Sequence, residues 1–431
     1  MKNIKLDSIL LFAFVVPFIM SYRLSPGDTP FWLFGLIFLG LLSYIVVDLL
    51  NVNKLLFLKL KKSLLWGLII LVIGSAFASA IITRHKTHPI DRIHDMPLQQ
   101  EIAIRFLIDG KNPYEVSYFG TFLEEWHYSE KDINPALYHF VLPPFYILFA
   151  VPFYFASNFL FGFFDARIPL LVLFLFLLIV ASVVVKDQDK KRLFLVLLAF
   201  NPAMLPYTLE GRSDIYMFAF LFFGLYLLHI KKYFVAGIPM ALAFAVKQSA
   251  WPILPFYLAF LYFHRKGNTT NILRASETSR EVAKPFVLDF ARTIKLLTPF
   301  IITFFIIVLP FLLWNSKAFL DSTVFYLSGS AEHSYPVSGY GLGKLLESFG
   351  FIKDIYAPYP FHIWQLIVCI PLLIFLIKYF KKHSDVKTLI LVYGIFLFVF
   401  WYLSRYLNNS HLGYLSLIFI TAYFWPENEK N

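Results

Sequence analysis

Hydrophobic and polar positions divide the chain into long apolar segments separated by polar loops. Apolar runs of roughly 17–22 residues without a charge are long enough to cross the hydrocarbon core of a bilayer. We expect about 12 such spans, which predicts an all-α, multi-pass membrane protein. The expected spans are residues 8–24, 30–49, 64–83, 168–185, 193–209, 213–230, 233–249, 251–263, 296–314, 361–379, 387–404 and 411–425.

Basic residues indicate the direction in which the chain crosses. Lysine and arginine concentrate in cytoplasmic loops, and the loop after the second expected span contains Lys54, Lys59, Lys61 and Lys62. That loop is therefore assigned to the inside and the polar island 84–144 to the outside. Both termini are then predicted to be cytoplasmic, in the plasma (inner) membrane if the source is prokaryotic.

Segment 137–160 is apolar enough to cross, but Pro143, Pro144 and Pro152 interrupt it. A crossing there would also move the densest basic loop, 264–295, to the outside. We therefore interpret the segment as a re-entrant or interfacial helix pair that lies over the active site, and the question of whether it crosses stays open.

This topology divides the chain into four parts. Residues 1–63 hold two amino-terminal spans, and residues 64–263 form a core with an outer catalytic loop at 84–167. A cytoplasmic basic loop, 264–295, separates this core from the carboxy-terminal spans of residues 296–431, which include a second outer loop at 315–360.

Composition agrees with a membrane protein, since 59% of the residues are hydrophobic and 15% are charged. The formal net charge of +11 would also suit nucleic acid, but the basic residues gather on one side of the predicted topology. They therefore indicate contact with anionic membrane lipids rather than nucleic acid. The single cysteine, Cys369, excludes a disulfide within the chain.

The outer island carries carboxylates suited to proton transfer. Asp95 precedes Pro97 and a predicted helix from Leu98 to Leu107, which places it at or near a helix N-cap. Capping is its simple structural interpretation, and a general base that accepts the proton of an attacking hydroxyl is the functional one. Asp91, in the same island, is a further candidate base.

Two connections between later spans carry charges close to the hydrocarbon boundary. Glu210, Arg212 and Asp214 share one short outer turn, where charges are costly without partners or water. They form either an interfacial salt-bridge cluster or a catalytic element in which the arginine binds a phosphate. Lys247 ends a helix of small residues and either extends to the interface or contacts a lipid phosphate.

Three further residues are candidate substrate contacts on the outer side. Arg405 lies in the last outer turn, and His333 lies in the polar, aromatic loop 315–360, which is suited to closing over a sugar. Tyr114 ends the turn Gly110-Lys111-Asn112-Pro113-Tyr114 and is a candidate to stack on a sugar face. A surface role is the alternative for both Arg405 and His333.

Two patterns suggest metal binding, although we expect no cofactor. Histidine and aspartate recur at every third position in His85, His88, Asp91 and His94. Such side chains are zinc ligands, so a divalent metal remains an alternative, but the spacing matches no metal motif. The pattern Asp187-Gln188-Asp189 resembles the metal-binding element of nucleotide-sugar enzymes, yet no strand–helix nucleotide domain accompanies it.

Several of these elements together resemble one family. Asp95, the turn ending at Tyr114 and then Pro143-Pro144 look like the first outer loop of integral-membrane glycosyltransferases of the GT-C fold. The stretch from Asn201 through Asp214 to Lys247 and Pro252 is similar to the middle of that family. Segment 338–346 resembles a late outer-loop element of its polyprenol-dependent, mannosyltransferase-like branch.

The resemblance covers about residues 64–350, and the two additional amino-terminal spans depart from the family pattern. It implies a polyprenyl-phosphate-linked sugar donor, an inverting single displacement on the outer face and usually no metal. It also implies that Asp95 is the base and Asp214 the second acidic element. The acceptor would be a glycan, a lipid or a protein.

Two other classes of function remain open. The second is a transporter or flippase of a lipid-linked saccharide, a class that often shows internal repeats and broken helices near the bilayer midplane. The chain has no repeat that we detect, and its charged outliers gather on one face, which favours the enzyme. A subunit of a glycan-export complex is the third interpretation.

Overall fold

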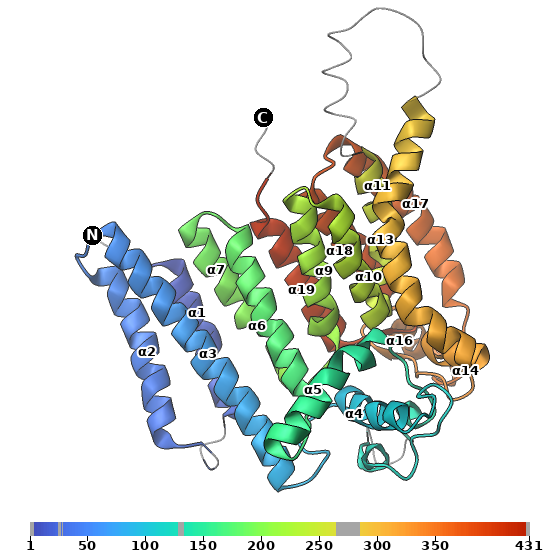
Figure 1. The fold of residues 1–431 in the computed structure, drawn as a ribbon, viewed down its shortest axis with the longest axis horizontal. Helices are drawn as coiled ribbons and strands as arrows, with labels where there is room; N and C mark the ends of the chain where they lie inside the picture. The colour runs from blue at the N-terminus through green and yellow to red at the C-terminus, as the bar shows by residue number, and fades with distance from the viewer. Residues whose placement is uncertain (1–3, 25–26, 28, 128–132, 264–284, 428–431) are drawn as a thin grey trace, which may run out of the picture.

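The computed structural model describes residues 4–24, 27, 29–127, 133–263 and 285–427. Helices that run side by side make up nearly all of it (Figure 1). Within this part of the chain the only strands are β1 (Ser338–Gly339) and β2 (Tyr406–Leu407), which pair in parallel. The described chain is therefore all-α, as the sequence predicts.

Three helices form the amino-terminal part of the bundle, drawn in blue in Figure 1. They are α1 (Leu6–Phe18), which continues into a π-helical turn (Ile19–Arg23), α2 (Phe31–Leu49) and α3 (Lys54–Lys86). The expected span 64–83 therefore lies in the carboxy-terminal part of α3, which begins ten residues earlier than predicted. Its helix starts at Lys54 because the Asn53 side chain accepts the Leu56 amide at 2.8 Å, which caps the first turn.

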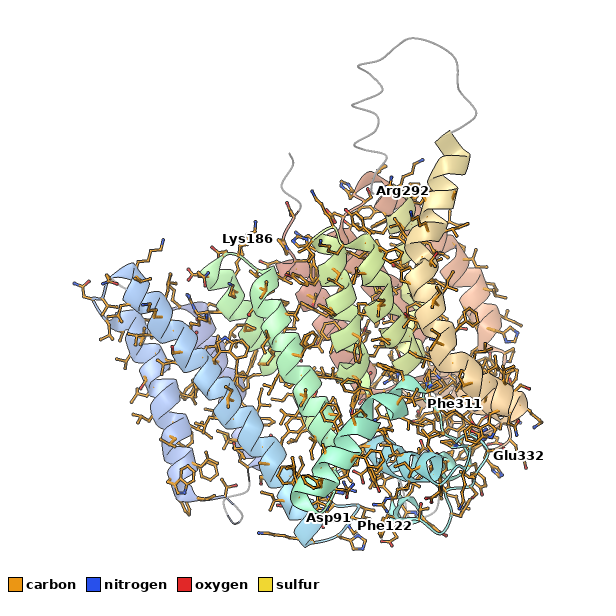
Figure 2. All side chains as sticks on the ribbon, in the orientation of Figure 1. Asp91, Phe122, Lys186, Arg292, Phe311 and Glu332 are labelled. Carbon is orange, nitrogen blue, oxygen red and sulfur yellow. The ribbon has the colours of Figure 1, made fainter. Side chains whose placement is uncertain are left out.

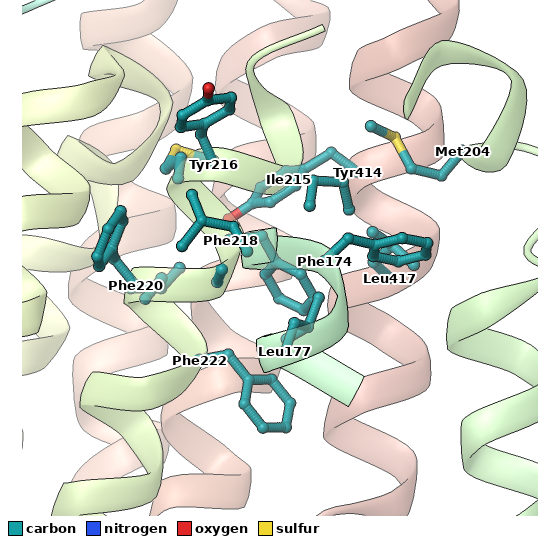
Figure 3. Packing of buried hydrophobic residues seen from close by; sticks show 14 of the residues in the cluster. Phe174, Leu177, Met204, Ile215, Tyr216, Phe218, Phe220, Phe222, Tyr414 and Leu417 are labelled. Carbon is teal, nitrogen blue, oxygen red and sulfur yellow. The ribbon is translucent and has the colours of Figure 1, made fainter. Parts of the chain in front are cut away.

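The central and carboxy-terminal helices surround a large apolar core. They are α6 (Arg167–Val184), α7 (Gln188–Ala199), α8 (Leu205–Leu209), α9 (Asp214–His229), α10 (Tyr233–Val246), α11 (Leu254–Phe263), α13 (Pro285–Trp314), α17 (Phe361–Lys382), α18 (Val386–Tyr402) and α19 (Asn409–Phe424). Figure 3 shows Phe174 of α6, Phe218 of α9 and Tyr414 of α19 packed together in this core. The rings of Phe218 and Tyr414 meet edge to face at 5.7 Å.

The two segments predicted as outer loops meet at one end of the bundle, where Figure 1 shows α4, α5, α14 and α16. Residues 84–167 supply α4 (Asp95–Ile108), the 3₁₀ turns η2 (Phe122–Glu125) and η3 (Pro135–Leu137), and α5 (Phe145–Phe161). Residues 315–360 supply α14 (Ser316–Leu320), a π-helical turn (Asp321–Phe325), α15 (Tyr326–Ser328) and α16 (Leu342–Ser348).

Figure 2 places Asp91 and Glu332 at this end and Lys186 and Arg292 at the opposite end. The polar segments assigned to one side of the membrane thus lie at one end of the bundle. We call it the outer end below, after the sidedness predicted from the sequence.

Segment 137–160 differs from the predicted helix pair. It contains a single helix, α5, which crosses the outer end of the bundle obliquely and packs against α4, α6 and α10 (Figure 1). Pro152 lies inside α5 and does not end it, contrary to the prediction. Pro152 is exposed, and α5 continues past it to Phe161 although a proline removes one amide hydrogen bond from the helix.

Five helices are long and apolar enough to cross a membrane among the residues that the structure describes: α2, α3, α6, the part of α13 from Ala291, and α17. Several others are apolar but shorter, including α9, α10 and α18. These helices support a multi-pass membrane protein, while the number of about 12 spans remains a prediction. Residues 264–284 of the basic loop lie outside the described chain, and α13 begins at Pro285 within the segment expected to be loop.

Candidate active site

Asp95 is the first residue of α4 and is buried. His94, not Asp95, occupies the N-cap position, and its Nδ1 atom lies 3.3 Å from the Met96 amide. The Asp95 carboxylate contacts His94 Nδ1, and its second oxygen accepts a hydrogen bond from Asn134 Nδ2 at 3.3 Å. Because His94 occupies the capping position, the Asp95 side chain does not serve as the N-cap that the sequence suggested.

The turn that carries Glu210, Arg212 and Asp214 lies directly against the start of α4. The His94 amide donates a hydrogen bond to the Glu210 carbonyl at 2.9 Å. Gly211, which follows Glu210 in this turn, has a φ of 91°, and a Cβ atom there would lie 2.7 Å from the Pro97 side chain of α4. Only glycine suits both the conformation and the close approach, so the two outer elements are held in a fixed relation.

Asp214 and Lys247 form a buried ion pair. Lys247 Nζ donates to Asp214 Oδ1 at 2.7 Å, and the two side chains are 8% and 0% exposed. Asp214 begins α9 and Lys247 follows the last residue of α10, so the pair joins these helices at the outer end. Asp214 Oδ2 is buried without a hydrogen-bond partner among the described residues.

Arg212, in the same turn, is partly exposed and forms a weaker ion pair with Glu210. Its Nε donates to Glu210 Oε2 at 3.3 Å, and its guanidinium carbon lies 4.7 Å from the centre of the Tyr207 ring. The two side chains of the ion pair are 20% and 28% exposed. Solvent screening makes such a pair weaker than the buried Asp214–Lys247 pair.

These elements enclose a cavity of about 1120 Å³. Asp95, Arg212 and Lys247 line it together, so the predicted base and two of the predicted phosphate-binding cations face one space. Asp214 lies behind Lys247, outside the lining. Much of the remaining lining is apolar or aromatic: Trp251, Pro255, Phe361, Phe396, Phe400 and Trp401.

Arg405 also lines the cavity but is built into the outer loop. Its guanidinium donates to three backbone carbonyls, those of Tyr335, Ile355 and Ala357. A Cβ atom at Gly329, which has a φ of 86°, would overlap the Arg405 guanidinium. Arg405 therefore organises segment 329–357 around itself, in addition to lying near any ligand.

Asp91, Tyr114 and His333 do not line the cavity. Tyr114 is 3% exposed, its hydroxyl donates to the Leu142 carbonyl at 2.8 Å, and its ring packs edge to face on Phe140 and Phe319. The His333 ring stacks on Tyr138 with a centroid distance of 3.7 Å. This stacking joins the two outer segments to each other.

The same junction contains His139, which sequence reasoning did not single out. Its Nε2 lies 2.6 Å from the Glu332 carbonyl and its Nδ1 lies 3.4 Å from Ser322 Oγ. Burial lowers the pKa of His139, against smaller opposing effects of the Glu332 carbonyl and the Asp321 carboxylate. The imidazole is therefore neutral at pH 7 and serves as a hydrogen-bonding link.

Sequence reasoning also missed a buried ion network beneath the site. Arg84 pairs with Glu101 at 2.7 Å and with Asp165 at 2.9 Å, and Arg167 pairs with Asp165 at 2.8 Å. Burial would raise the pKa of Asp165, but Arg167, with help from His85 and Arg84, holds it well below its usual range. The network fastens α3, α4 and α6 together.

The members of the two metal-like patterns each have other partners. His85 faces Asp165, and His88 Nε2 lies 3.1 Å from Glu125 Oε2. Asp187 caps α7 through the Lys190 amide, and Asp189 pairs with Arg192. The described chain contains no group of three or more histidine, cysteine, aspartate or glutamate side chains arranged to hold a metal ion.

Comparison with known proteins returned no matching family model, curated protein or solved structure. The assignment of a function therefore depends on the chemistry of the cavity and on the resemblance of the individual sequence elements.

Proposed function

We propose that this chain is a membrane glycosyltransferase. It moves a sugar from a polyprenyl-phosphate donor to an acceptor on the extracytoplasmic face, with inversion at the anomeric carbon. The observation that carries this proposal is the shared cavity, which combines one buried carboxylate, Asp95, with the cations Arg212 and Lys247. Its apolar walls suit an isoprenoid chain, and a lipid-linked donor needs no nucleotide-binding domain.

The proposed reaction is a single displacement. An acceptor hydroxyl attacks the anomeric carbon, a new carbon–oxygen bond forms, and the bond from that carbon to the donor phosphate breaks. Asp95 receives the hydroxyl proton. Negative charge that develops on the leaving phosphate is stabilised by Arg212 and Lys247, which both line the cavity. Asp214 holds Lys247 in position through the buried ion pair.

The test is sugar transfer in proteoliposomes. The donor is radiolabelled sugar on polyprenyl phosphate, the acceptors are a mixed pool, and wild type is compared with Asp95→Asn. We expect the substitution to lower the transfer rate by about 10²- to 10⁴-fold, as loss of a general base does. Asp109→Asn is the matched control, because Asp109 is exposed and follows the opposite end of the same helix.

Each outcome bears on the proposal. Label that leaves the lipid with wild type and not with Asp95→Asn supports both the enzyme class and the base. Equal transfer by both proteins assigns the base elsewhere, with Asp91 and Asp214 as the next variants. Movement of intact donor across the bilayer without bond cleavage would replace the transferase with a flippase.

A further inference from the structure

His411 is a buried imidazole in the first turn of α19 that faces the cavity. It is 6% exposed, and its ring is held between two aromatic side chains. The centroid distances are 4.5 Å to Trp401 and 5.4 Å to Tyr406. These contacts leave the ring little freedom to rotate.

A backbone hydrogen bond fixes the tautomer of this ring. The Asn408 amide donates to His411 Nδ1 at 3.1 Å. A nitrogen that accepts a hydrogen bond from an amide carries no proton, so in the neutral ring the proton must be on Nε2. Within the described chain the His411 side chain makes its hydrogen bond at Nδ1, which leaves Nε2 as a donor for a ligand in the cavity that the ring lines.

The surroundings of His411 match an anionic ligand. Lys247 and Arg212 line the same cavity and lie within electrostatic reach of the ring, as does the Asp214 carboxylate, which is already paired with Lys247. The start of α19, which carries His411, packs closely against the turn at Ala203, since a Cβ atom at Gly413 would overlap the Ala203 carbonyl oxygen.

We propose that His411 donates its Nε2 proton in a hydrogen bond to a phosphate oxygen, completing an anion subsite with Lys247 and Arg212. The inference deepens the proposed function and rests on it for the lipid-phosphate donor. His411 thus binds the phosphate of the ligand, while Asp95, which lines the same cavity, receives the proton of the acceptor. A lipid phosphate and free phosphate share this chemistry.

The experiment measures binding of ³²P-labelled farnesyl phosphate and of inorganic phosphate to the purified full-length chain. Two variants separate ligand binding from helix capping. His411→Asn keeps an oxygen that can accept the Asn408 amide but lacks the Nε2 donor, while His411→Gln keeps a donor near the Nε2 position and loses the cap. The control is His229→Asn, since His229 also packs on a tryptophan edge but at the inner end of α9.

We expect His411→Asn to weaken binding of farnesyl phosphate by about 10- to 100-fold, the range for a hydrogen bond to a charged group. His411→Gln should stay closer to wild type than His411→Asn, and His229→Asn should match wild type. Weaker binding with Gln than with Asn would mean that His411 serves only the cap, and would overturn the proposal. So would unchanged binding by His411→Asn, or no phosphate binding by wild type.

The two proposals fail separately. If His411→Asn loses phosphate binding but wild type transfers no sugar in proteoliposomes, the anion subsite stands and the transferase assignment fails. If wild type transfers sugar and His411→Asn binds phosphate normally, the reverse holds. Equal competition by inorganic phosphate would identify free phosphate, rather than the lipid ester, as the natural ligand of the subsite.

Discussion

Replacement of Lys61 by methionine tests how the two additional amino-terminal helices are attached. Lys61 of α3 is fully buried, and its Nζ lies 2.7 Å from Asp48 Oδ1 of α2, which is also fully buried. It donates as well to the Tyr44 carbonyl at 2.9 Å and lies 3.8 Å from the centre of the Tyr44 ring. Lys61→Met keeps the apolar stem but leaves the Asp48 carboxylate buried without its cation.

Breaking one partner of a buried ion pair costs about 3–5 kcal/mol, because the remaining charge is uncompensated. At 1.4 kcal/mol for each factor of ten, opening of the α1–α3 region should become about 10²- to 4 × 10³-fold more frequent. Hydrogen exchange of the α1 and α2 amides, measured in micelles by mass spectrometry, reports that opening directly. Heat survival of the solubilised protein gives an independent check.

Two further variants make the reasoning refutable. The double variant Lys61→Met with Asp48→Asn removes both charges and should recover most of the protection, since no unpaired charge is left. Lys62→Met, at the exposed neighbouring position, should change stability by no more than about 0.5 kcal/mol. Wild-type exchange in Lys61→Met, or a double variant as unstable as the single one, would refute the buried-charge explanation.

Three other predictions concern the outer end. Arg405→Met removes the donor from three loop carbonyls and should lower the free energy of unfolding by about 1–3 kcal/mol, which should appear as lower survival on heating. Gly413→Ala places a methyl group on the Ala203 carbonyl oxygen and should cost about 1–3 kcal/mol in the same assay. Burial lowers the pKa of His139, so the unfolded chain binds the extra proton; stability should fall as the pH drops below about 6.5, and His139→Gln should remove that part of the dependence.

Hydropathy predicted helices well where one apolar run is a single helix. The expected spans 30–49 and 168–185 correspond closely to α2 (Phe31–Leu49) and α6 (Arg167–Val184). The expected span 193–209 instead contains two helices, because the chain turns at Asn201-Pro202 between α7 and α8. A window of mean hydropathy does not register such a break, since the turn residues are too few to interrupt the apolar run.

The site was predictable to the extent that its residues are close in sequence to recognisable outer turns. Asp95, Arg212 and Lys247 were named in advance and share one cavity. Tyr114 was predicted to stack on a sugar, but its ring is buried. The sequence alone does not distinguish an exposed aromatic side chain from a packed one.

The buried ion pairs could not be foreseen, because their partners are far apart along the chain. Arg84 reaches Asp165 across 81 positions, and Lys61 appeared to be one more lysine of a cytoplasmic loop. Only the fold shows that these charges face each other rather than water. The sequence likewise shows His411 only as part of a polar turn, whereas in the structure it lines the same cavity as Lys247 and Arg212.

The ion pair between Asp7 of α1 and Arg192 of α7 also constrains the order in which the helices assemble during synthesis. Asp7 of α1 accepts a hydrogen bond from Arg192 of α7 at 3.0 Å, and the two residues are 185 positions apart. At typical translation rates the ribosome needs about 10–40 s to synthesise that stretch. During this interval Arg192 has not yet been synthesised, so the Asp7 carboxylate lacks this partner. We therefore expect α1 to dock only after α7 has entered the bilayer.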